Sequence, residues 1–209
     1  MGINILHRKE QLILTAIDII DELGIQRLTT REIAKRQQIS EATLFRHFNN
    51  KNELLMAVLD YFIQFDADIL ESTKLHQLRP TEAITYLITS YAEYYENYPA
   101  IASILLIFHV LINEEELSGK IVEIQEDRTA TIESLVKKAV QSGELRGDVD
   151  TNMIAVMIYG FFRELCLNWK ISNHKFSLRD RSSSTLEMLL ATLQIKSGDG
   201  EEHHHGGMV

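Results

Sequence analysis

Three polar residues, Thr29, Ser40 and Asn50, recur at intervals of ten or eleven, and each precedes a short stretch with apolar residues at helical spacing. Side chains of these types accept hydrogen bonds from the first amides of a helix, so each one predicts a helix start. Glu32 and Glu53, three residues after Thr29 and Asn50, complete the pattern of a capping box. Helix starts attract anions because their first amides have no partner within the helix. The chemistry that this segment suggests is therefore the binding of phosphate groups.

Short helices must position these residues. Residues 5–23 have apolar side chains at helical spacing, and Gly24 provides a stop. We expect a helix of two turns over residues 29–37 and another over residues 40–47. Because the connection between them is so short, the two helices must turn sharply against each other, which is typical of a helix–turn–helix unit. The expected small core of this unit is Ile33, Ala34, Ile39, Leu44 and Phe48.

The helix expected over residues 40–47 has little apolar surface of its own. Leu44 and Phe48 fix one side of it, and small or polar residues occupy its N-terminal end. Because a helix this short is unstable alone, its neighbours must hold it in place. Small residues allow close approach to another surface, and the major groove of DNA admits a single helix. DNA binding is one interpretation, and a helical corner that only packs within the protein is the other.

The segment LTTREIAKRQQISEATLFRHFNNKNELLMAVL resembles the helix–turn–helix of the TetR family of bacterial transcriptional repressors. The shared pattern is a Thr before the second helix, an Ile-Ala pair within it, the run I-S-x-x-T-L-F-x-H-F, and a K-x-x-L continuation. It covers residues 8–60. The resemblance implies an all-α fold with an N-terminal DNA-binding domain and a larger helical domain for ligand binding and dimerisation.

The resemblance also implies which residues contact DNA. Ala42 and Thr43 match base-facing positions, and the other positions match residues that contact or grip the phosphate backbone. Two departures from the family pattern stand out: Phe45 replaces a common Tyr and removes a phenol hydrogen bond, and Glu41 replaces a common Lys. Glu41 either serves only its own helix or accepts a hydrogen bond from a cytosine amino group. The full expected set is Thr29, Thr30, Ser40, Ala42, Thr43, Phe45, Arg46, His47 and Lys51.

Beyond residue 50 the sequence predicts longer helices and no strand, in keeping with only two prolines and ten glycines. We expect about nine helices in the whole chain. We assign residues 1–50 to the DNA-binding domain, linked by a helix over 51–75, and residues 51–196 to the ligand-binding and dimerisation domain. Residues 197–209 are expected to be a disordered tail. The later helices are expected over residues 51–75, 80–97, 99–112, 115–142, 149–171 and 177–195.

Four tyrosines, Tyr91, Tyr94, Tyr95 and Tyr98, recur at helical spacing and predict an aromatic stripe on one face. Such a stripe is either plain core or part of a pocket, since four phenols are costly to bury without partners. The family resemblance implies a pocket among the middle helices for a small, largely apolar effector. His109 is either a polar anchor in that pocket or an ordinary core or surface histidine.

The family resemblance further implies that the last two helices pair with a second copy as a four-helix bundle. Burial of the same residues within one chain is the alternative. A two-fold homodimer suits a protein that binds a palindromic site in double-stranded DNA. The residues expected at the dimer interface are Ile158, Phe162, Trp169, Leu186, Leu189, Leu190 and Leu193.

The composition, with 45% apolar and 24% charged residues, is that of a globular protein. The formal charge of −9 arises after residue 60, because residues 1–60 hold equal numbers of basic and acidic residues. This favours the N-terminal part as the one that approaches phosphate. A single cysteine, Cys166, and the absence of a signal peptide or membrane span predict a cytosolic protein that is not associated with a membrane. The family resemblance implies that this is the bacterial or archaeal cytosol and that the protein is associated with the nucleoid.

The sequence contains no HExxH, GxSxG, CxxC or Gly-rich phosphate loop. We therefore expect no enzyme activity, no cofactor and no metal site. The run His203–His205 is expected to belong to a solvated or cloning-derived tail, with metal binding as the alternative. The family resemblance implies a ligand-responsive transcriptional regulator, a repressor in the main interpretation and an activator in another. A helical protein-binding adaptor is the competing function.

Overall fold

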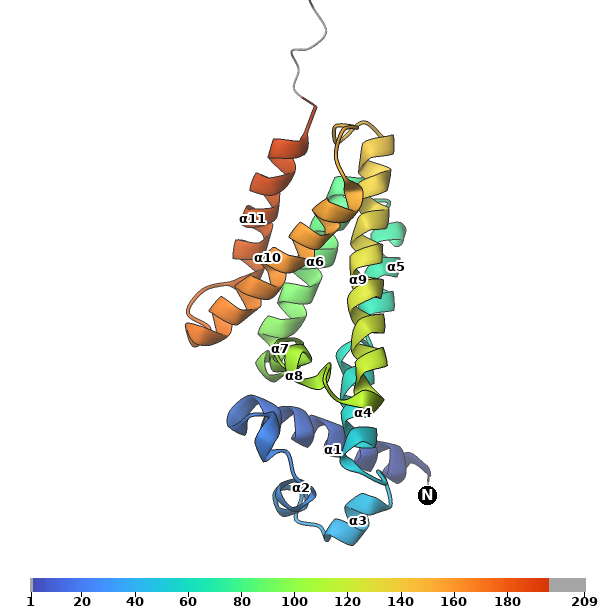
Figure 1. Ribbon diagram of the computed structural model, residues 1–209, viewed down its shortest axis with the longest axis vertical. Helices are drawn as coiled ribbons and strands as arrows, with labels where there is room; N and C mark the ends of the chain where they lie inside the picture. Colours follow the sequence, from blue (N-terminus) through green and yellow to red (C-terminus); the bar gives the residue numbers. More distant parts are fainter. Residues whose placement is uncertain (1, 196–209) are drawn as a thin grey trace, which may run out of the picture.

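The computed structural model describes residues 2–195, which form eleven α-helices and one 3-10 helix (Figure 1). The predicted all-α class is confirmed, and no strand occurs between residues 2 and 195. The predicted tail and His203–His205 lie outside the described residues. The elements are α1 (Gly2–Leu23), η1 (Ile25–Arg27), α2 (Thr30–Arg36), α3 (Glu41–Phe45), α4 (Lys51–Phe62), α5 (Asp66–Leu75), α6 (Pro80–Asn97), α7 (Pro99–Leu106), α8 (Phe108–Leu111), α9 (Glu115–Gln141), α10 (Thr151–Ile171) and α11 (Leu178–Leu193).

The helix expected over residues 51–75 is divided into α4 and α5. It stops at Phe62 and restarts at Asp66, although no glycine or proline marks the break. Contacts from elsewhere in the chain account for the break. The Phe62 ring is fully buried, and the Asp66 carboxylate is held by Arg128 of α9. Local periodicity carries no information about such contacts, so it predicted one continuous helix over residues 51–75.

The helix expected over residues 99–112 is divided in the same way into α7 and α8. The break follows Leu106, and the buried ring of Phe108 packs edge-on against Phe62 with 5.6 Å between ring centroids. The helix expected over residues 40–47 is also shorter than predicted, because α3 ends at Phe45. The two divisions raise the number of α-helices from the expected nine to eleven in the described part of the chain.

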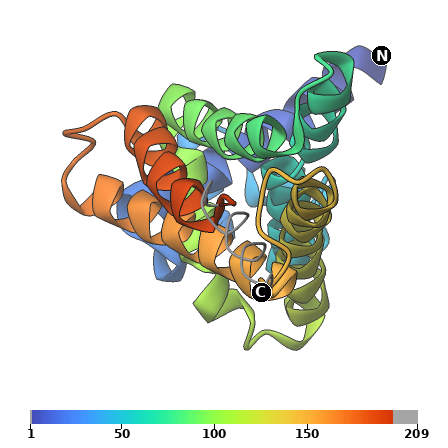
Figure 2. The ribbon, with the colours of Figure 1, turned by 90° about the horizontal axis from the view of Figure 1, so that it is seen from above.

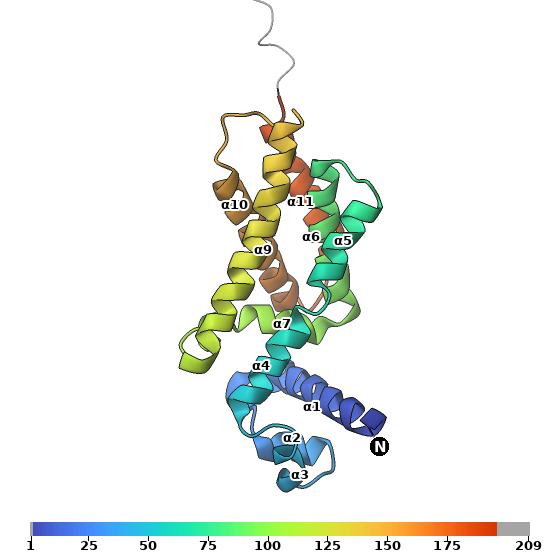
Figure 3. The same cartoon turned by 90° about the vertical axis from the view of Figure 1, so that its right-hand side faces the viewer.

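Helices α1, α2 and α3 form a small unit at one end of the molecule, which we call the head (Figures 1 and 3). The three predicted helix caps are confirmed. Each cap accepts a hydrogen bond from a first-turn amide that has no partner within its helix, so the short α2 and α3 have defined starts. The cap side-chain oxygens accept hydrogen bonds as follows: Thr29 from the Glu32 amide at 3.1 Å, Ser40 from the Thr43 amide at 3.1 Å, and Asn50 from the Glu53 amide at 2.7 Å.

The predicted sharp turn between α2 and α3 is centred on Gln38, whose φ of 53° lies in the left-handed region. The Ile39 amide closes the turn by donating to the Ala34 carbonyl at 3.0 Å. This geometry brings the apolar residues of both helices together beneath α3. Of the five residues predicted for the small core, four are buried and Ile39 is half-buried: Ile33, Ala34, Ile39, Leu44 and Phe48.

Helices α5 to α11 form a larger unit, the body, and α4 runs from the head into it (Figures 1 and 3). Within the body α10 packs on α9, and α11 packs on α6. Helices α10 and α11 lie on the side of the molecule away from α5 (Figure 2). The body therefore has two different faces, one formed by α5 and α9 and the other by α10 and α11.

The residues predicted for the dimer interface lie mostly inside the body, and that prediction was wrong for six of the seven. Phe162, for example, has no exposed surface and stacks on Tyr95 with 5.8 Å between ring centroids. A side chain buried within one chain has no surface to offer a second copy. Only Leu189 is half-exposed. The six buried residues are Ile158, Phe162, Trp169, Leu186, Leu190 and Leu193.

Polar contacts fix the head to the body at two places. On one side, two carboxylates of α1 meet the body: Asp18 accepts a hydrogen bond from the Tyr98 hydroxyl at 3.2 Å, and Asp21 pairs with Lys170. On the other side, Asp60 of α4 pairs with Lys120 of α9 at 3.2 Å. The orientation of the head thus depends on both α1 and α4.

Candidate DNA interface and effector pocket

Helix α3 lies at the outer tip of the head, farthest from the body (Figures 1 and 3). All nine residues that the family pattern assigns to DNA contact are exposed or half-exposed. Ala42 projects from the first turn of α3, while Leu44 on the opposite side is buried. The small, polar side of α3 therefore faces away from the protein, as a helix that enters a DNA groove requires.

Two threonines, Thr29 and Thr30, are equal candidates for phosphate contact from sequence alone, but their hydroxyl groups differ in the structure. The Thr30 hydroxyl donates to the Glu41 carboxylate at 2.6 Å. The Thr29 oxygen accepts from the Glu32 amide, which leaves its hydroxyl hydrogen free to donate. Thr29 is therefore the better placed of the two to donate to a phosphate oxygen.

The Glu41 carboxylate joins the start of α3 to the start of α2 through Thr30. Since it also lies in the first turn of α3, where the helix dipole favours a negative charge, its contacts are accounted for within the protein. The structure thus favours the interpretation in which Glu41 serves its helix over the one in which it contacts cytosine.

Arg46 and Thr43 lie together on the exposed side of the head. The Arg46 guanidinium donates to the Thr43 hydroxyl at 3.4 Å, and Phe45 exposes 46% of its surface beside them. In the same head, the ammonium of the exposed Lys9 of α1 lies 5.0 Å from the centroid of the buried Phe48 ring. The head therefore offers one guanidinium and one exposed aromatic ring next to the positions of α3 that the family pattern assigns to base contact.

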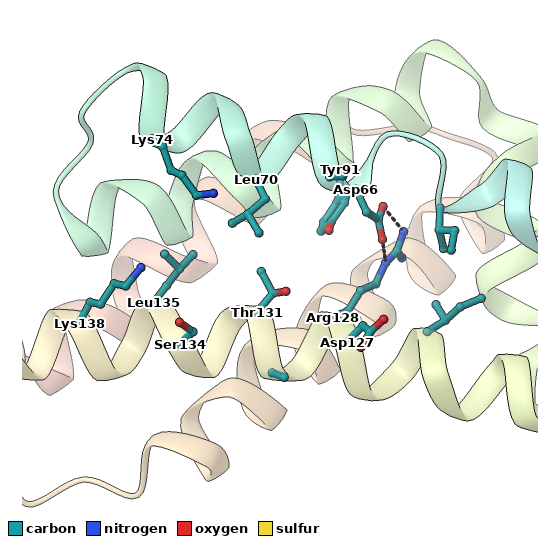
Figure 4. A pocket seen from close by; sticks show the side chains of 14 residues that line it. Asp66, Leu70, Lys74, Tyr91, Asp127, Arg128, Thr131, Ser134, Leu135 and Lys138 are labelled. Carbon is teal, nitrogen blue, oxygen red and sulfur yellow. Dashed lines mark hydrogen bonds and ion pairs between the residues drawn. The ribbon is translucent and has the colours of Figure 1, made fainter.

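A groove with a cavity of about 660 Å³ lies between α5 and α9 in the body (Figure 4). Helix α5 covers it lightly, because Thr73 is the single buried residue of that helix. Tyr91 of α6 forms part of the inner wall. The residues that line the groove are Ile63, Asp66, Ala67, Leu70, Lys74, Tyr91, Ile124, Asp127, Arg128, Ala130, Thr131, Ser134, Leu135 and Lys138.

Arg128 is buried at the inner end of this groove, with 3% of its surface exposed. Its guanidinium donates two hydrogen bonds to the Asp66 carboxylate, at 2.7 and 2.8 Å, and a third to the Tyr95 hydroxyl at 3.1 Å. The guanidinium carbon also lies 4.4 Å from the ring centroid of Phe62 and 4.6 Å from that of Tyr91. A buried charge needs such partners, and here they come from α4, α5 and α6.

The predicted pocket residues do not form one site. Tyr91 lines the groove, whereas Tyr95 is fully buried behind it. Tyr94 packs edge-on against Phe65, and Tyr98 bonds to the head. The expected stripe is divided because different parts of the chain contact its members: α9 contacts Tyr91, the α4–α5 junction contacts Tyr94, and α1 contacts Tyr98. Burial raises the pKa of Tyr91 and of Tyr95, so both phenols stay protonated.

The suggestion that His109 anchors an effector in the tyrosine pocket was wrong. His109 is exposed and lines a separate surface hollow together with Arg163 and Glu164 of α10. Its Nδ1 atom lies 2.8 Å from the Leu106 carbonyl oxygen, a local contact within the α7–α8 segment. The alternative interpretation of His109 as a surface histidine is the one that the structure supports.

Arg128 and Asp66 were not among the residues predicted from the sequence, although the sequence contains a signal for Arg128. Arg128 falls in the apolar stripe of the long helix α9, where helical spacing calls for an apolar residue: Leu117, Ile121, Ile124, Arg128, Ile132 and Leu135. A charged residue at a core position indicates a buried ion pair or a ligand contact.

Between residues 2 and 195, no three His, Cys, Asp or Glu side chains gather as a metal site would require.

Comparison with known families identifies the chain. Residues 12–58 match the family "Bacterial regulatory proteins, tetR family", and residues 50–192 match "YsiA-like protein, C-terminal region". The chain therefore belongs to the TetR family of bacterial regulatory proteins, and the predicted resemblance is confirmed. As a member of this family it is a DNA-binding transcriptional regulator that responds to a ligand.

Individual relatives are similar along almost their whole length. The fatty acid metabolism regulator protein of Bacillus subtilis is 23% identical over 186 residues, which cover 89% of this chain and 95% of the relative. The nucleoid occlusion factor SlmA of Salmonella paratyphi B is 24% identical over 195 residues, which cover 90% and 96%. The two relatives are about equally similar to this chain but are named for different roles. The relatives alone therefore do not assign a particular role to this chain.

Solved structures show the same fold. The transcriptional regulator FadR of Bacillus subtilis, in complex with stearoyl-CoA, matches with a TM-score of 0.76 and 23% identity, covering 88% of this chain and 99% of that one. The ketosteroid transcriptional regulator KstR2 of Mycobacterium tuberculosis matches with a TM-score of 0.77 and 18% identity, covering 90% and 96%. Between residues 2 and 195, no helix has the length and apolar character needed to cross a bilayer.

Arg46 and Thr43 should have separable effects on DNA binding. Arg46→Gln is expected to lower affinity about tenfold across many DNA sequences and to reduce the salt dependence, because the family pattern assigns Arg46 to backbone contact. Thr43→Ala is expected to change base preference instead. Binding to a library of duplexes at several salt concentrations measures both effects, with Arg179→Gln, on the exposed surface of α11, as the control. Identical binding profiles for the Arg46 and Thr43 variants would contradict this assignment.

Proposed function

We propose that this protein is a repressor that binds a palindromic operator as a homodimer and is released by an amphiphilic effector with a long apolar chain. In this proposal residues 1–50 bind DNA, and residues 51–196 bind the effector and the second copy. The observation that carries the proposal is the position of the groove, which ends at the junction of α4 and α5. A ligand in this groove would touch the element that connects the body to the head.

The chemical class of the effector is inferred from the groove and from one relative. Leu70 and Leu135 supply apolar wall from opposite sides, and the cavity of about 660 Å³ is within the usual size range of small-molecule sites. The similar FadR of Bacillus subtilis was solved with stearoyl-CoA. We therefore favour a fatty acyl compound, and a fatty acyl thioester in particular, as the effector of this chain.

The ion pair of Arg128 and Asp66 provides a physical route from the groove to the head. Arg128 contacts Phe62, the last residue of α4, and Asp66, the first residue of α5. Since α5 has few buried contacts of its own, a ligand that moves α5 also changes the position of Asp66 and the end of α4. We propose that the two copies of α3 in the DNA-bound dimer are separated by one turn of DNA, about 34–36 Å, and that this displacement changes their separation.

The surface for the second copy is inferred from the outward face of α10 and α11, which is also apolar. Helix α10 has apolar residues on both sides, and a helix of that kind needs cover on both. Met157 and Met188 expose 47% and 68% of their surfaces and border a hollow of about 380 Å³. An apolar patch of this kind marks an interface. The proposed contact residues are Met153, Val156, Met157, Phe161, Met188 and Leu189.

Two alternatives are weaker on specific grounds. The function of a helical protein-binding adaptor without DNA binding does not explain why α3 is capped, faces outward and has a small, polar exposed side. The sequence contains none of the catalytic motifs HExxH, GxSxG or CxxC, and the buried Arg128 cation of the groove is engaged by Asp66. We infer that the protein acts as a regulator at chromosomal DNA and not as an enzyme.

A single glycine tests the proposed dimer face. Gly160 lies on the exposed side of α10, and a Cβ atom added there meets no atom within 4 Å. Gly160→Arg is therefore expected to fold as a single chain but to convert the dimer to a monomer at micromolar concentration, measured by sedimentation velocity. Gly119→Arg, at an equally open exposed position of α9, is the matched control and should stay dimeric. A dimeric Gly160→Arg protein would refute the assigned face.

The proposed effector class is tested by stability and by release from DNA. Stearoyl-CoA at about 100 times its Kd should stabilise the protein by about 2.7 kcal/mol, which raises Tm by about 5–10 °C, and should release operator DNA. Leu70→Trp fills the groove and should abolish both responses while DNA affinity stays intact. Leu75→Trp, on the same helix but with 74% of Leu75 exposed, is the control. Undiminished responses in the Leu70 variant would place the effector elsewhere.

A further inference from the structure

The two ends of the groove between α5 and α9 differ in charge (Figure 4). Lys74 and Lys138 lie at one end, and Asp66, Asp127 and Arg128 lie at the other. On α9, residues 128 and 138 are separated by about 15 Å along the helix axis. The groove is therefore elongated, and a bound molecule with one charged end would prefer one direction.

The cationic end is formed by two helices that face each other. Lys74 belongs to the last turn of α5, Lys138 belongs to the last turn of α9, and the two amino groups point into the groove from opposite sides. A helix C-terminus favours a nearby cation, which accounts for a lysine in each last turn. That effect does not require both lysines to project into the same groove.

Existing contacts leave the two lysines available to a ligand. The Lys74 ammonium lies 2.8 Å from the Glu71 carboxylate, but both side chains are more than half exposed, so water and salt screen the pair and make it weak. Lys138 has no ion-pair partner in the part of the chain that the structure describes, whereas its neighbour Lys137 pairs with Glu133 at 2.8 Å. An anion between Lys74 and Lys138 would meet two cations and displace only one weak contact.

The opposite end of the groove is unsuited to a free anion. The Arg128 charge is matched by the bidentate Asp66 carboxylate, and the rings of Phe62 and Tyr91 cover its guanidinium. Asp127 adds a negative charge near this end. Between the two ends lie Leu70 and Leu135. Apolar wall therefore separates an anion-attracting end from an anion-repelling one.

We propose that Lys74 and Lys138 bind the anionic group of the effector, whose apolar chain then runs between Leu70 and Leu135 toward Tyr91. This assignment rests on the proposed function of the groove as the effector pocket. The ligand class is an amphiphile with one apolar chain and a phosphate or carboxylate group. Charge-assisted hydrogen bonds from the two ammonium groups would fix its direction in the groove.

The test compares three probes that share a twelve-carbon chain: lauroyl-CoA, laurate and uncharged 1-dodecanol. Their Kd values are measured by calorimetry for the wild type, for Lys74→Gln/Lys138→Gln, and for the control Lys137→Gln. The double variant should bind lauroyl-CoA about 100-fold more weakly, about tenfold for each lysine, whereas dodecanol binding should change less than twofold. The Lys137 variant should match the wild type with all three probes.

The outcomes separate the subsite from the proposed function. A parallel loss of laurate affinity identifies a carboxylate as a sufficient anion, and loss confined to lauroyl-CoA identifies the phosphates. Equal weakening of dodecanol, or unchanged lauroyl-CoA affinity in the double variant, overturns the lysine subsite while the effector pocket stands. If the wild type binds none of the probes, both the proposed effector class and the subsite are overturned.

Discussion

A buried ion pair between Arg128 and Asp66 is the contact on which the arrangement of the body depends. Loss of the Asp66 carboxylate would leave the Arg128 charge buried without compensation, a change that costs about 3–5 kcal/mol. That is a large part of the 5–15 kcal/mol that typically separates folded from unfolded states. The contacts of Arg128 with Phe62, Tyr91 and Tyr95 bring α4, α6 and α9 together around this one charge.

The ion pair also lies where one helix ends and the next begins. Asp66 opens α5 at the position where Arg128 holds it, and the chain turns between Phe62 and Asp66 without a glycine or a proline. The head is attached to the body through α4 and through the α1 carboxylates Asp18 and Asp21. In the proposed mechanism the direction of α3 follows from both attachments, and the effector acts on the first of them.

The parts of the fold that the sequence predicted are those set by local chemistry. A cap such as Ser40 or a short linker such as residues 37–39 acts through its immediate neighbours, and the helix–turn–helix followed from such features. The breaks within residues 51–75 and 99–112 could not be predicted in this way, because partners distant in the chain cause them. Arg128 is intermediate, since its place in an apolar stripe was visible but its partner was not.

The dimer residues were misplaced for a related reason. Helix α10 has two apolar sides, and periodicity alone does not tell which one faces α9 and which faces outward. The predicted interface lay on the side of Ile158 and Phe162, and these two residues are buried within the chain. The side of Met153 and Met157 stays exposed and is the one now proposed for the second copy. Which side is buried is decided by the packing of α9 and α11, a property of the whole fold.

The most direct test of the central claim is the distance between the two heads of a dimer, measured by pulsed electron spin resonance. A Lys35→Cys variant carries a spin label on the exposed surface of α2, and the native Cys166 is buried and unreactive. Stearoyl-CoA should shift the distance distribution when Arg128 and Asp66 are present. In the variant Asp66→Asn/Arg128→Met, which leaves no unpaired buried charge, the ligand should still bind without shifting the distribution. The same ligand-induced shift in both proteins would contradict a role for the ion pair in coupling.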